Sequence, residues 1–177
     1  MPFDNQPTLV GELLSARPLQ ATDHSALYAV ASDPLIWEQH PEPERYKPAI
    51  FGKFFDESLE SGGALIVRDS ARRTVIGSSR YHGYDESLSE VEIGWTFFAR
   101  SHWGGRYNGD LKRLMLEHAF QFVESVILYI SPTNIRSQRA VQRVGGNREP
   151  ARDQPGRFFY RIRPPRSRGA ACWPGTV

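Results

Sequence analysis

The stretch from residue 108 to residue 130 constrains the fold more than any other part of this 177-residue chain. Residues 108–123 place apolar side chains three and four positions apart on one broad face, which predicts a largely buried helix. Residues 126–130 follow as five consecutive apolar residues, a pattern typical of a strand covered on both faces. We therefore expect an α/β fold: a central, twisted, mixed sheet of about seven strands with helices on both faces.

The rest of the chain divides into shorter elements at its prolines and glycines. Thr22 begins a helix that Asp33-Pro34 ends, and a loop with three prolines runs from His40 to Pro48. The other predicted helices cover residues 50–60, 108–123 and 135–144, and the predicted strands cover 9–18, 64–68, 74–81, 91–99, 126–130 and 157–162.

Length and composition favour one cytoplasmic domain over residues 1–163, with a basic tail over 164–177. No apolar run approaches the ~18 residues of a membrane span, and the first seven residues do not resemble a secretory signal. The single cysteine, Cys172, excludes an internal disulfide, and no His/Cys/Asp/Glu set has metal-ligand spacing. Four arginines and no acids occupy the last 17 residues, so the body of the chain is nearly neutral and does not fit a nucleic-acid footprint.

A glycine-containing turn between a strand and a helix is the most informative chemical feature. It reads Trp103-Gly104-Gly105-Arg106-Tyr107-Asn108-Gly109 and leads directly into the predicted helix. Such a turn presents unpaired backbone N–H groups at the positive end of a helix dipole, which suits a phosphate or pyrophosphate. The motif is neither a Walker loop nor a dinucleotide fingerprint.

The order of motifs around this turn resembles the GNAT acetyltransferases. It runs Glu92-Ile93-Gly94-Trp95, Trp103-Gly104, a helix containing His118-Ala119-Phe120, a buried strand, and Asn134-x-x-Ser137 before Gly145-Gly146. The likeness covers about residues 8–162 and is greatest to the Rim-type ribosomal-protein N-terminal acetyltransferases. The pyrophosphate loop of the family reads Q/R-x-x-G-x-G/A, and this chain departs from it at Trp103, Arg106 and Asn108.

The resemblance implies that acetyl-CoA is the cosubstrate. The loop from Gly104 to Gly109, including Arg106, Tyr107 and Asn108, would bind the pyrophosphate, and Phe97, Phe98 and Ala99 would pair with pantetheine through their backbone. Asn134 matches the asparagine that holds the pantetheine arm, and Ser137 matches the position that protonates the departing thiolate.

Several of these residues also have structural interpretations. Asn134 is a common helix N-cap, and Ser137 is a first-turn hydroxyl. Glu92 lies in an apolar strand, so it is a general base, a hydrogen-bond acceptor for the substrate amine, or one half of a buried ion pair. Tyr107 packs on either the cofactor or the sheet, and His118 is expected to be a core histidine.

We expect an N-acetyltransferase in which an amine attacks acetyl-CoA directly in a ternary complex. A protein N-terminal α-amine is the first choice of acceptor, and a small-molecule amine is the second. The alternative from another class is a CoA-binding sensor without turnover. The enzyme is expected to be a monomer or a homodimer, with no metal, nucleic acid or membrane partner.

Overall fold

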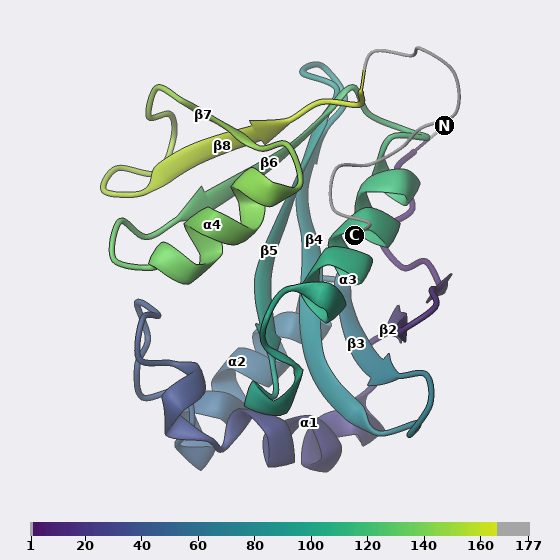
Figure 1. Cartoon of the computed structure of the whole chain (residues 1–177), viewed down its shortest axis with the longest axis vertical. Coiled ribbons are helices and arrows are strands. Elements are labelled where there is room, and N and C mark those ends of the chain that lie inside the picture. Colours follow the sequence, from purple (N-terminus) through teal and green to yellow (C-terminus); the bar gives the residue numbers. More distant parts are fainter. Residues whose placement is uncertain (1, 166–177) are drawn as a thin grey trace.

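The computed structural model describes residues 2–165 of the chain (Figure 1). Arg166, Arg168 and Cys172 of the predicted basic tail lie outside the described residues. The strands are β1 (Leu9–Val10), β2 (Leu14–Pro18), β3 (Ala64–Asp69), β4 (Val75–Asp85), β5 (Glu90–Phe98), β6 (Ser125–Ile130), β7 (Asn147–Glu149) and β8 (Phe158–Ile162). The helices are α1 (His24–Ala31), α2 (Pro48–Glu60), α3 (Arg106–Ala119) and α4 (Ile135–Arg143), with 3₁₀ turns η1 (Ala21–Asp23), η2 (Pro34–Ile36) and η3 (Arg100–His102).

The strands form one sheet in the order β1-β2-β3-β4-β5-β6-β8-β7 (Figure 1). Every neighbouring pair is antiparallel except β5 and β6, which are parallel and are joined by the crossover through α3. The predicted mixed sheet is therefore confirmed, with eight strands rather than about seven.

The sheet separates two hydrophobic clusters, which places helices on both of its faces. Side chains of α3 and α4 pack in one cluster, and side chains of α1 and α2 pack in the other. Alternate residues of a strand point to opposite faces of the sheet, so one strand contributes to both clusters. In β3, Leu65 and Val67 belong to the first cluster, and Ala64 and Ile66 belong to the second. The first cluster also contains Val91 and Ile93 of β5, so Glu92 between them points toward the α1/α2 face.

The predicted single strand over residues 9–18 is wrong, because the chain turns there and forms β1 and β2 as a hairpin. Gly11 N donates to Leu14 O at 2.8 Å. A β-carbon on Gly11 would lie 2.6 Å from the carboxylate of Asp110 on α3, so the turn passes too close to the helix for a larger residue. Asp110 also accepts a hydrogen bond from Leu13 N. The distant helix thus determines where this strand breaks.

Other predicted boundaries shift at the helix ends. Thr22 does not cap a helix, since it lies within η1 and α1 begins at His24. The predicted helix 108–123 is α3, which begins earlier because Gly105 serves as its N-cap and ends at Ala119. Strand β7 gave no signal in the sequence because its three residues are polar or charged.

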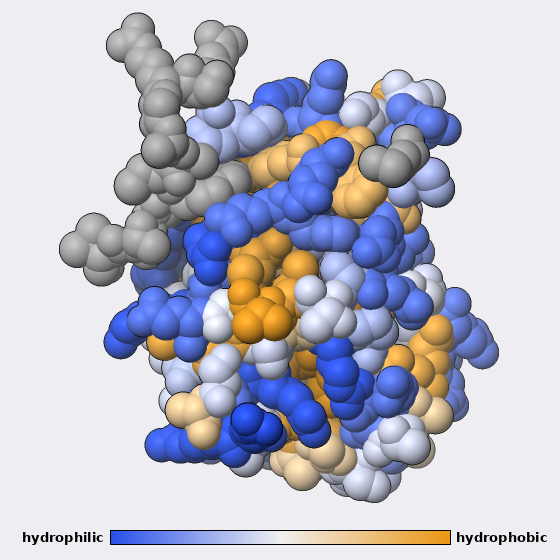
Figure 2. All heavy atoms as spheres, turned by 90° about the vertical axis from the view of Figure 1, so that its right-hand side faces the viewer, coloured by the Kyte–Doolittle hydropathy of each residue, from blue (hydrophilic) through white to orange (hydrophobic). Residues whose placement is uncertain are grey.

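Both edges of the sheet are short strands, which limits edge-to-edge pairing with another chain. Strand β1 has two residues and β7 has three. Figure 2 shows the side of the molecule on which β1 lies: hydrophilic residues cover most of it, around a central group of hydrophobic ones. Val10 of β1 has a relative exposure of 74 %.

Candidate active site

The sheet opens where β5 and β6 separate. The two strands pair only at Glu90↔Ser125, Val91↔Val126 and Glu92↔Ile127. Beyond Glu92 no strand of residues 2–165 pairs with β5 on that side, and Figure 1 shows the two strands diverging. The separation begins at Glu92, the glutamate that the sequence analysis singled out.

A bulge in β5 lies immediately beyond this point. Ser78 pairs with Phe97 and Arg80 pairs with Gly94, so three steps along β5 oppose two along β4. Trp95 takes up the additional residue with φ +52°, a conformation that bulky residues rarely adopt. The bulge bends β5 away from β6 and gives the open edge a fixed shape.

Glu92 is buried at this fork without a partner. Its relative exposure is 6 %, and within residues 2–165 its carboxylate makes no hydrogen bond or ion pair. The Glu92 side chain extends along the strand toward Gly94. Its Oε1 atom would lie 3.3 Å from a β-carbon if Gly94 carried one. Burial raises the pKa of Glu92 to about 7, although the charges of Arg157 and Arg80 act in the opposite direction. A carboxyl group with this pKa is suited to accepting a proton near neutral pH.

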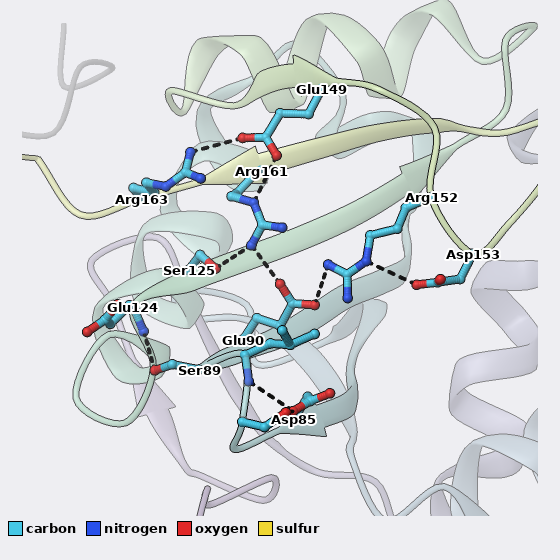
Figure 3. A network of polar contacts seen from close by, with 12 residues as sticks. Asp85, Ser89, Glu90, Glu124, Ser125, Glu149, Arg152, Asp153, Arg161 and Arg163 are labelled. Carbon is cyan, nitrogen blue, oxygen red and sulfur yellow. Dashed lines mark hydrogen bonds and ion pairs between the residues drawn. The ribbon is translucent and has the colours of Figure 1, made fainter.

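Glu90, two residues earlier on the same face, has a structural role instead. Its carboxylate contacts Arg161 Nη1 at 2.6 Å and Arg152 Nη1 at 2.8 Å. Figure 3 shows this network, in which Arg161 also contacts Ser125 and Glu149. It ties β5, β6, β7 and β8 together at the closed end of the fork. The sequence analysis did not single out Glu90.

The turn before α3 presents its backbone as predicted. Gly104 and Gly105 have φ of +105° and +108°. Residues with a side chain rarely adopt these angles, so the conformation of the turn explains why glycine occupies both positions. No side chain caps α3, and among the described residues no acceptor is found for the first-turn N–H groups of Arg106, Tyr107 and Asn108. Arg106 begins the helix with a negative φ, so its departure from the family pattern does not distort the turn.

A second arginine lies beside this turn. Arg143 of α4 places Nη1 3.4 Å from the position of a β-carbon on Gly105. The sequence analysis missed Arg143, because the two residues meet only when α4 packs beside the turn. Arg106, Arg143 and the unpaired N–H groups together form an anion-binding arrangement.

Tyr107 packs on the sheet, which decides between the two interpretations of this residue. Its hydroxyl donates to Asp69 Oδ2 at 2.8 Å, and His102 Nε2 lies 3.3 Å from the same oxygen. The hydrogen bonds from the Arg72 backbone and from Tyr107 are the main causes that lower the pKa of Asp69 to about 2. Tyr107 therefore fixes the start of α3 to β3 through its hydroxyl, and its backbone N–H stays available to a ligand.

Trp103 and Arg136 meet beside the open end of β5. Trp103 Nε1 donates to Phe98 O at 3.0 Å, and the Arg136 guanidinium lies 3.9 Å from the Trp103 ring centre. Arg136 Nη2 also donates to Ile36 O in the segment between α1 and α2.

The residues predicted to contact pantetheine lie at the end of β5. Phe97 and Phe98 have buried side chains, and the Phe98 carbonyl already accepts one hydrogen bond, from Trp103 Nε1. Ala99 borders an open pocket of about 530 Å³ beside α1.

Asn134 is the N-cap of α4, so its structural interpretation is confirmed. Its Oδ1 accepts from Ser137 N at 3.0 Å. The Ser137 hydroxyl makes no hydrogen bond to any described residue, which leaves it available to a ligand. His118, expected in the core, is half-buried among aromatic rings, and its Nε2 bonds to Asp4 O at 2.8 Å.

Lys112 is a buried cation that the sequence did not reveal. Its relative exposure is 7 %, and Nζ donates to Thr96 Oγ1 at 2.8 Å on the open part of β5. No described acidic residue pairs with it, and burial lowers the pKa of Lys112 to about 7. It lies on the α3 side of the sheet, whereas Glu92 faces α1 and α2.

Residues 2–165 contain no helix long and apolar enough to cross a membrane. In the same part of the chain, no group of three or more His, Cys, Asp or Glu residues could hold a metal ion.

Comparison with known proteins identifies the domain. The family model described as "Acetyltransferase (GNAT) domain" matches residues 14–147. No curated protein matches the chain.

Solved structures of acetyltransferases share the fold. The acetyltransferase from Agrobacterium tumefaciens is 26 % identical, with a TM-score of 0.70 over 88 % of this chain and 94 % of that one. A GCN5-related N-acetyltransferase from Brucella melitensis is 19 % identical, with a TM-score of 0.76 over 92 % and 80 %. RimJ from Mycobacterium smegmatis, in complex with CoA-disulfide, is 16 % identical, with a TM-score of 0.69 over 92 % and 90 %.

Proposed function

Because the chain belongs to the GNAT family of acetyltransferases, we propose that it transfers an acetyl group from acetyl-CoA to a protein N-terminal α-amine by direct attack in a ternary complex. The observation that carries the proposal is Glu92, a buried and unpaired carboxyl at the point where β5 separates from β6. We assign the chain to the Rim-type branch on the motifs in its sequence.

The turn before α3 and the open edge of β5 would bind acetyl-CoA. The unpaired N–H groups of Arg106, Tyr107 and Asn108 suit the pyrophosphate, with Arg106 and Arg143 as additional cations. Gly104 and Gly105 keep the turn open to close approach. Gly109 lies in the first turn of α3 with its N–H bonded to Gly105 O, and it would serve by leaving the space beside the turn free of a side chain. The backbone of Phe97, Phe98 and Ala99, together with Asn134, would hold the pantetheine arm.

Glu92 and Ser137 would act at the attacking nitrogen and at the departing sulfur, respectively. The attacking amine must be neutral, and Glu92, directly or through water, would accept the proton that the amine loses as its nitrogen bonds to the acetyl carbon. When the carbon–sulfur bond breaks, the electron pair goes to sulfur, and the Ser137 hydroxyl would assist by hydrogen bonding to the thiolate. No protein nucleophile is required.

The acidity of the amine favours a protein N-terminus as acceptor. An α-amine with a pKa near ~7.7–8.0 is partly neutral at pH 7, whereas a lysine-like amine near ~10.4 is almost wholly protonated. A single carboxyl with a pKa of about 7 is an adequate base for the first and a weak one for the second. Peptide N-termini are therefore expected to be better substrates than alkylamines.

Two measurements test the proposal. Acetyl-CoA at 100-fold its Kd is expected to stabilise the protein by about 2.7 kcal/mol, seen as a rise in Tm. Release of CoA thiol is then measured with a peptide and with an alkylamine. No stabilisation at millimolar acetyl-CoA contradicts the binding site. Stabilisation without thiol release for any amine would make the chain a CoA sensor, and equal rates for both amines would remove the preference for N-termini.

A further inference from the structure

Beside the fork, Arg80 is buried and Arg45 is half-buried, and within residues 2–165 neither has an acidic partner at ion-pair distance. Arg80 of β4 has a relative exposure of 6 %, and its Nη2 donates to Ser58 Oγ on α2. Arg45, in the segment between α1 and α2, contacts His40 Nε2 through Nη1 at 3.2 Å. The Nε atoms of both arginines are buried and lack a hydrogen-bond acceptor among the described residues. Neither guanidinium lies within ion-pair distance of an Asp or Glu in that part of the chain.

Both arginines are held against aromatic rings. The Arg45 guanidinium lies 4.4 Å from the centre of Phe54, and the Arg80 guanidinium lies 4.5 Å from the centre of Trp95 and 5.8 Å from Phe54. The rings offset part of the cost of removing the two charges from water, but they provide no counter-charge. Burial is the main cause that lowers the pKa of Arg80 and that lowers the pKa of Arg45 to about 10. The charges of Glu57 on both arginines, of Glu42 on Arg45 and of Glu92 on Arg80 raise these pKa values but do not cancel the effect of burial.

Most of the other half-buried arginines are paired with acids, Arg136 over the Trp103 ring being an exception. Arg161 contacts Glu90 and Glu149, and Arg17 contacts Asp23 at 2.6 Å. Figure 3 shows the Arg161 guanidinium between Glu90, Glu149 and Ser125. Two neighbouring guanidinium groups withdrawn from water are costly when no described carboxylate lies at ion-pair distance, and an anion between or beside them would reduce that cost. Arg80 and Arg45 therefore indicate an anionic ligand.

The anionic ligand of Arg80 and Arg45 would lie close to the acceptor amine, because Arg80 is near Glu92. Arg80 stands opposite Gly94 in the β4–β5 ladder, and the Glu92 carboxylate lies along β5 toward the same glycine. Arg80 and Glu92 are near enough for the charge of Arg80 to act on the Glu92 carboxyl, yet they do not form an ion pair. An amine that gives its proton to Glu92 would thus have its remaining groups beside Arg80.

We infer that the acceptor carries a carboxylate close to its reacting amine, and that Arg80 and Arg45 bind this carboxylate. This inference rests on the proposed function and specifies its substrate. The carboxylate belongs either to a free amino acid or to an acidic first residue of a peptide. In both cases charge-assisted hydrogen bonds from the guanidinium groups would orient the amine toward Glu92.

The test uses acceptors that differ only in the carboxylate. We would measure kcat/KM for peptides that begin with Asp and with Asn, and for a free amino acid and its α-amide. The carboxylate member of at least one pair is expected to be better by about 10- to 100-fold, mainly through KM, because a hydrogen bond to a charged group contributes that much. The pair that shows the preference identifies the source of the carboxylate.

Variants connect the preference to the two arginines. Arg80→Gln and Arg45→Gln are each expected to reduce the preference to a few-fold at most, while the Kd for acetyl-CoA is unchanged. Arg148→Gln is the matched control, because it removes an exposed arginine that also lies over an aromatic ring, Phe158. If Arg80→Gln does not fold, Arg45→Gln alone decides the question. A role in packing alone would lower stability without changing the preference.

Three outcomes of these kinetic measurements distinguish failure of the inference from failure of the proposed function. Equal kcat/KM within both acceptor pairs overturns the inference and leaves the acetyltransferase function intact. A preference that persists in both arginine variants assigns the carboxylate to other residues and also overturns the inference. Absence of transfer to every acceptor, with acetyl-CoA bound, contradicts the proposed function itself.

Discussion

Replacing Glu92 with Gln is expected to increase stability and to reduce activity. The Glu92 carboxyl has a pKa of about 7 in the fold, raised by burial, against an ordinary value of 4.5. Between these two pH values the folded protein binds more protons than the unfolded chain, so the contribution of Glu92 makes stability fall as pH rises. Above pH 7 the full penalty is present, and it amounts to about 3 kcal/mol as an upper estimate.

The amide in Glu92→Gln stays neutral, so this penalty disappears from the variant. Near pH 4 its free energy of unfolding is expected to lie below that of the wild type by the cost of burying an unpaired amide. Above pH 7 it is expected to exceed that of the wild type by up to ~3 kcal/mol less the same cost. Activity is expected to fall by ~10²-fold or more near pH 7, because the amide cannot accept the proton of the amine. Part of the activity should return at high pH, where the amine deprotonates without assistance.

Urea unfolding between pH 4.5 and 8.5, together with thiol release over the same range, measures both effects. Glu90→Gln is the matched control, since Glu90 is equally buried on the same strand but contacts Arg161 and Arg152. That variant leaves buried charge uncompensated and is expected to lose about 3–5 kcal/mol of stability. The reasoning is refuted if Glu92→Gln is less stable at every pH and keeps its kcat in the folded fraction, because Glu92 would then be a structural acceptor.

Three further predictions concern the helices beside the fork. Replacing both Gly104 and Gly105 with valine is expected to weaken acetyl-CoA binding while the protein stays folded. Both glycines have positive φ, and their backbone must approach the ligand closely. An unchanged affinity for acetyl-CoA in calorimetry would place the pyrophosphate elsewhere. Ser137→Ala is expected to lower kcat more than it raises the KM for acetyl-CoA, and a change in KM alone would make Ser137 a binding contact. Burial lowers the pKa of Lys112 to about 7, so between pH 7 and 10.5 the unfolded chain binds more protons than the folded protein. The contribution of Lys112 to the free energy of unfolding therefore rises with pH by up to ~1.4 kcal/mol per pH unit. Urea unfolding of Lys112→Met at pH 7 and 9.5 should lack this rise, and an unchanged pH dependence would contradict it.

The local sequence pattern was sufficient to identify most helices and strands and the family. Helical and alternating spacings depend on neighbouring residues, so α2, α3 and the central strands could be located from the sequence. The glycines before α3 were also recognisable, because a turn into a helix requires particular residues at particular positions. Strand β7 had no apolar pattern, and the break between β1 and β2 depends on contact with Asp110 of α3.

The roles of the polar residues were decided by tertiary structure. Glu90 and Glu92 are the same amino acid two positions apart on one strand, and nothing local distinguishes them. Arg161, 71 residues further along the chain, reaches Glu90, whereas Glu92 lies where the ladder ends and no described side chain forms an ion pair with it. Lys112 and Arg80 likewise acquired their significance from burial with no ion-pair partner within residues 2–165. A side chain's charge is written in the sequence, but whether that charge is paired depends on which distant segments the fold brings beside it.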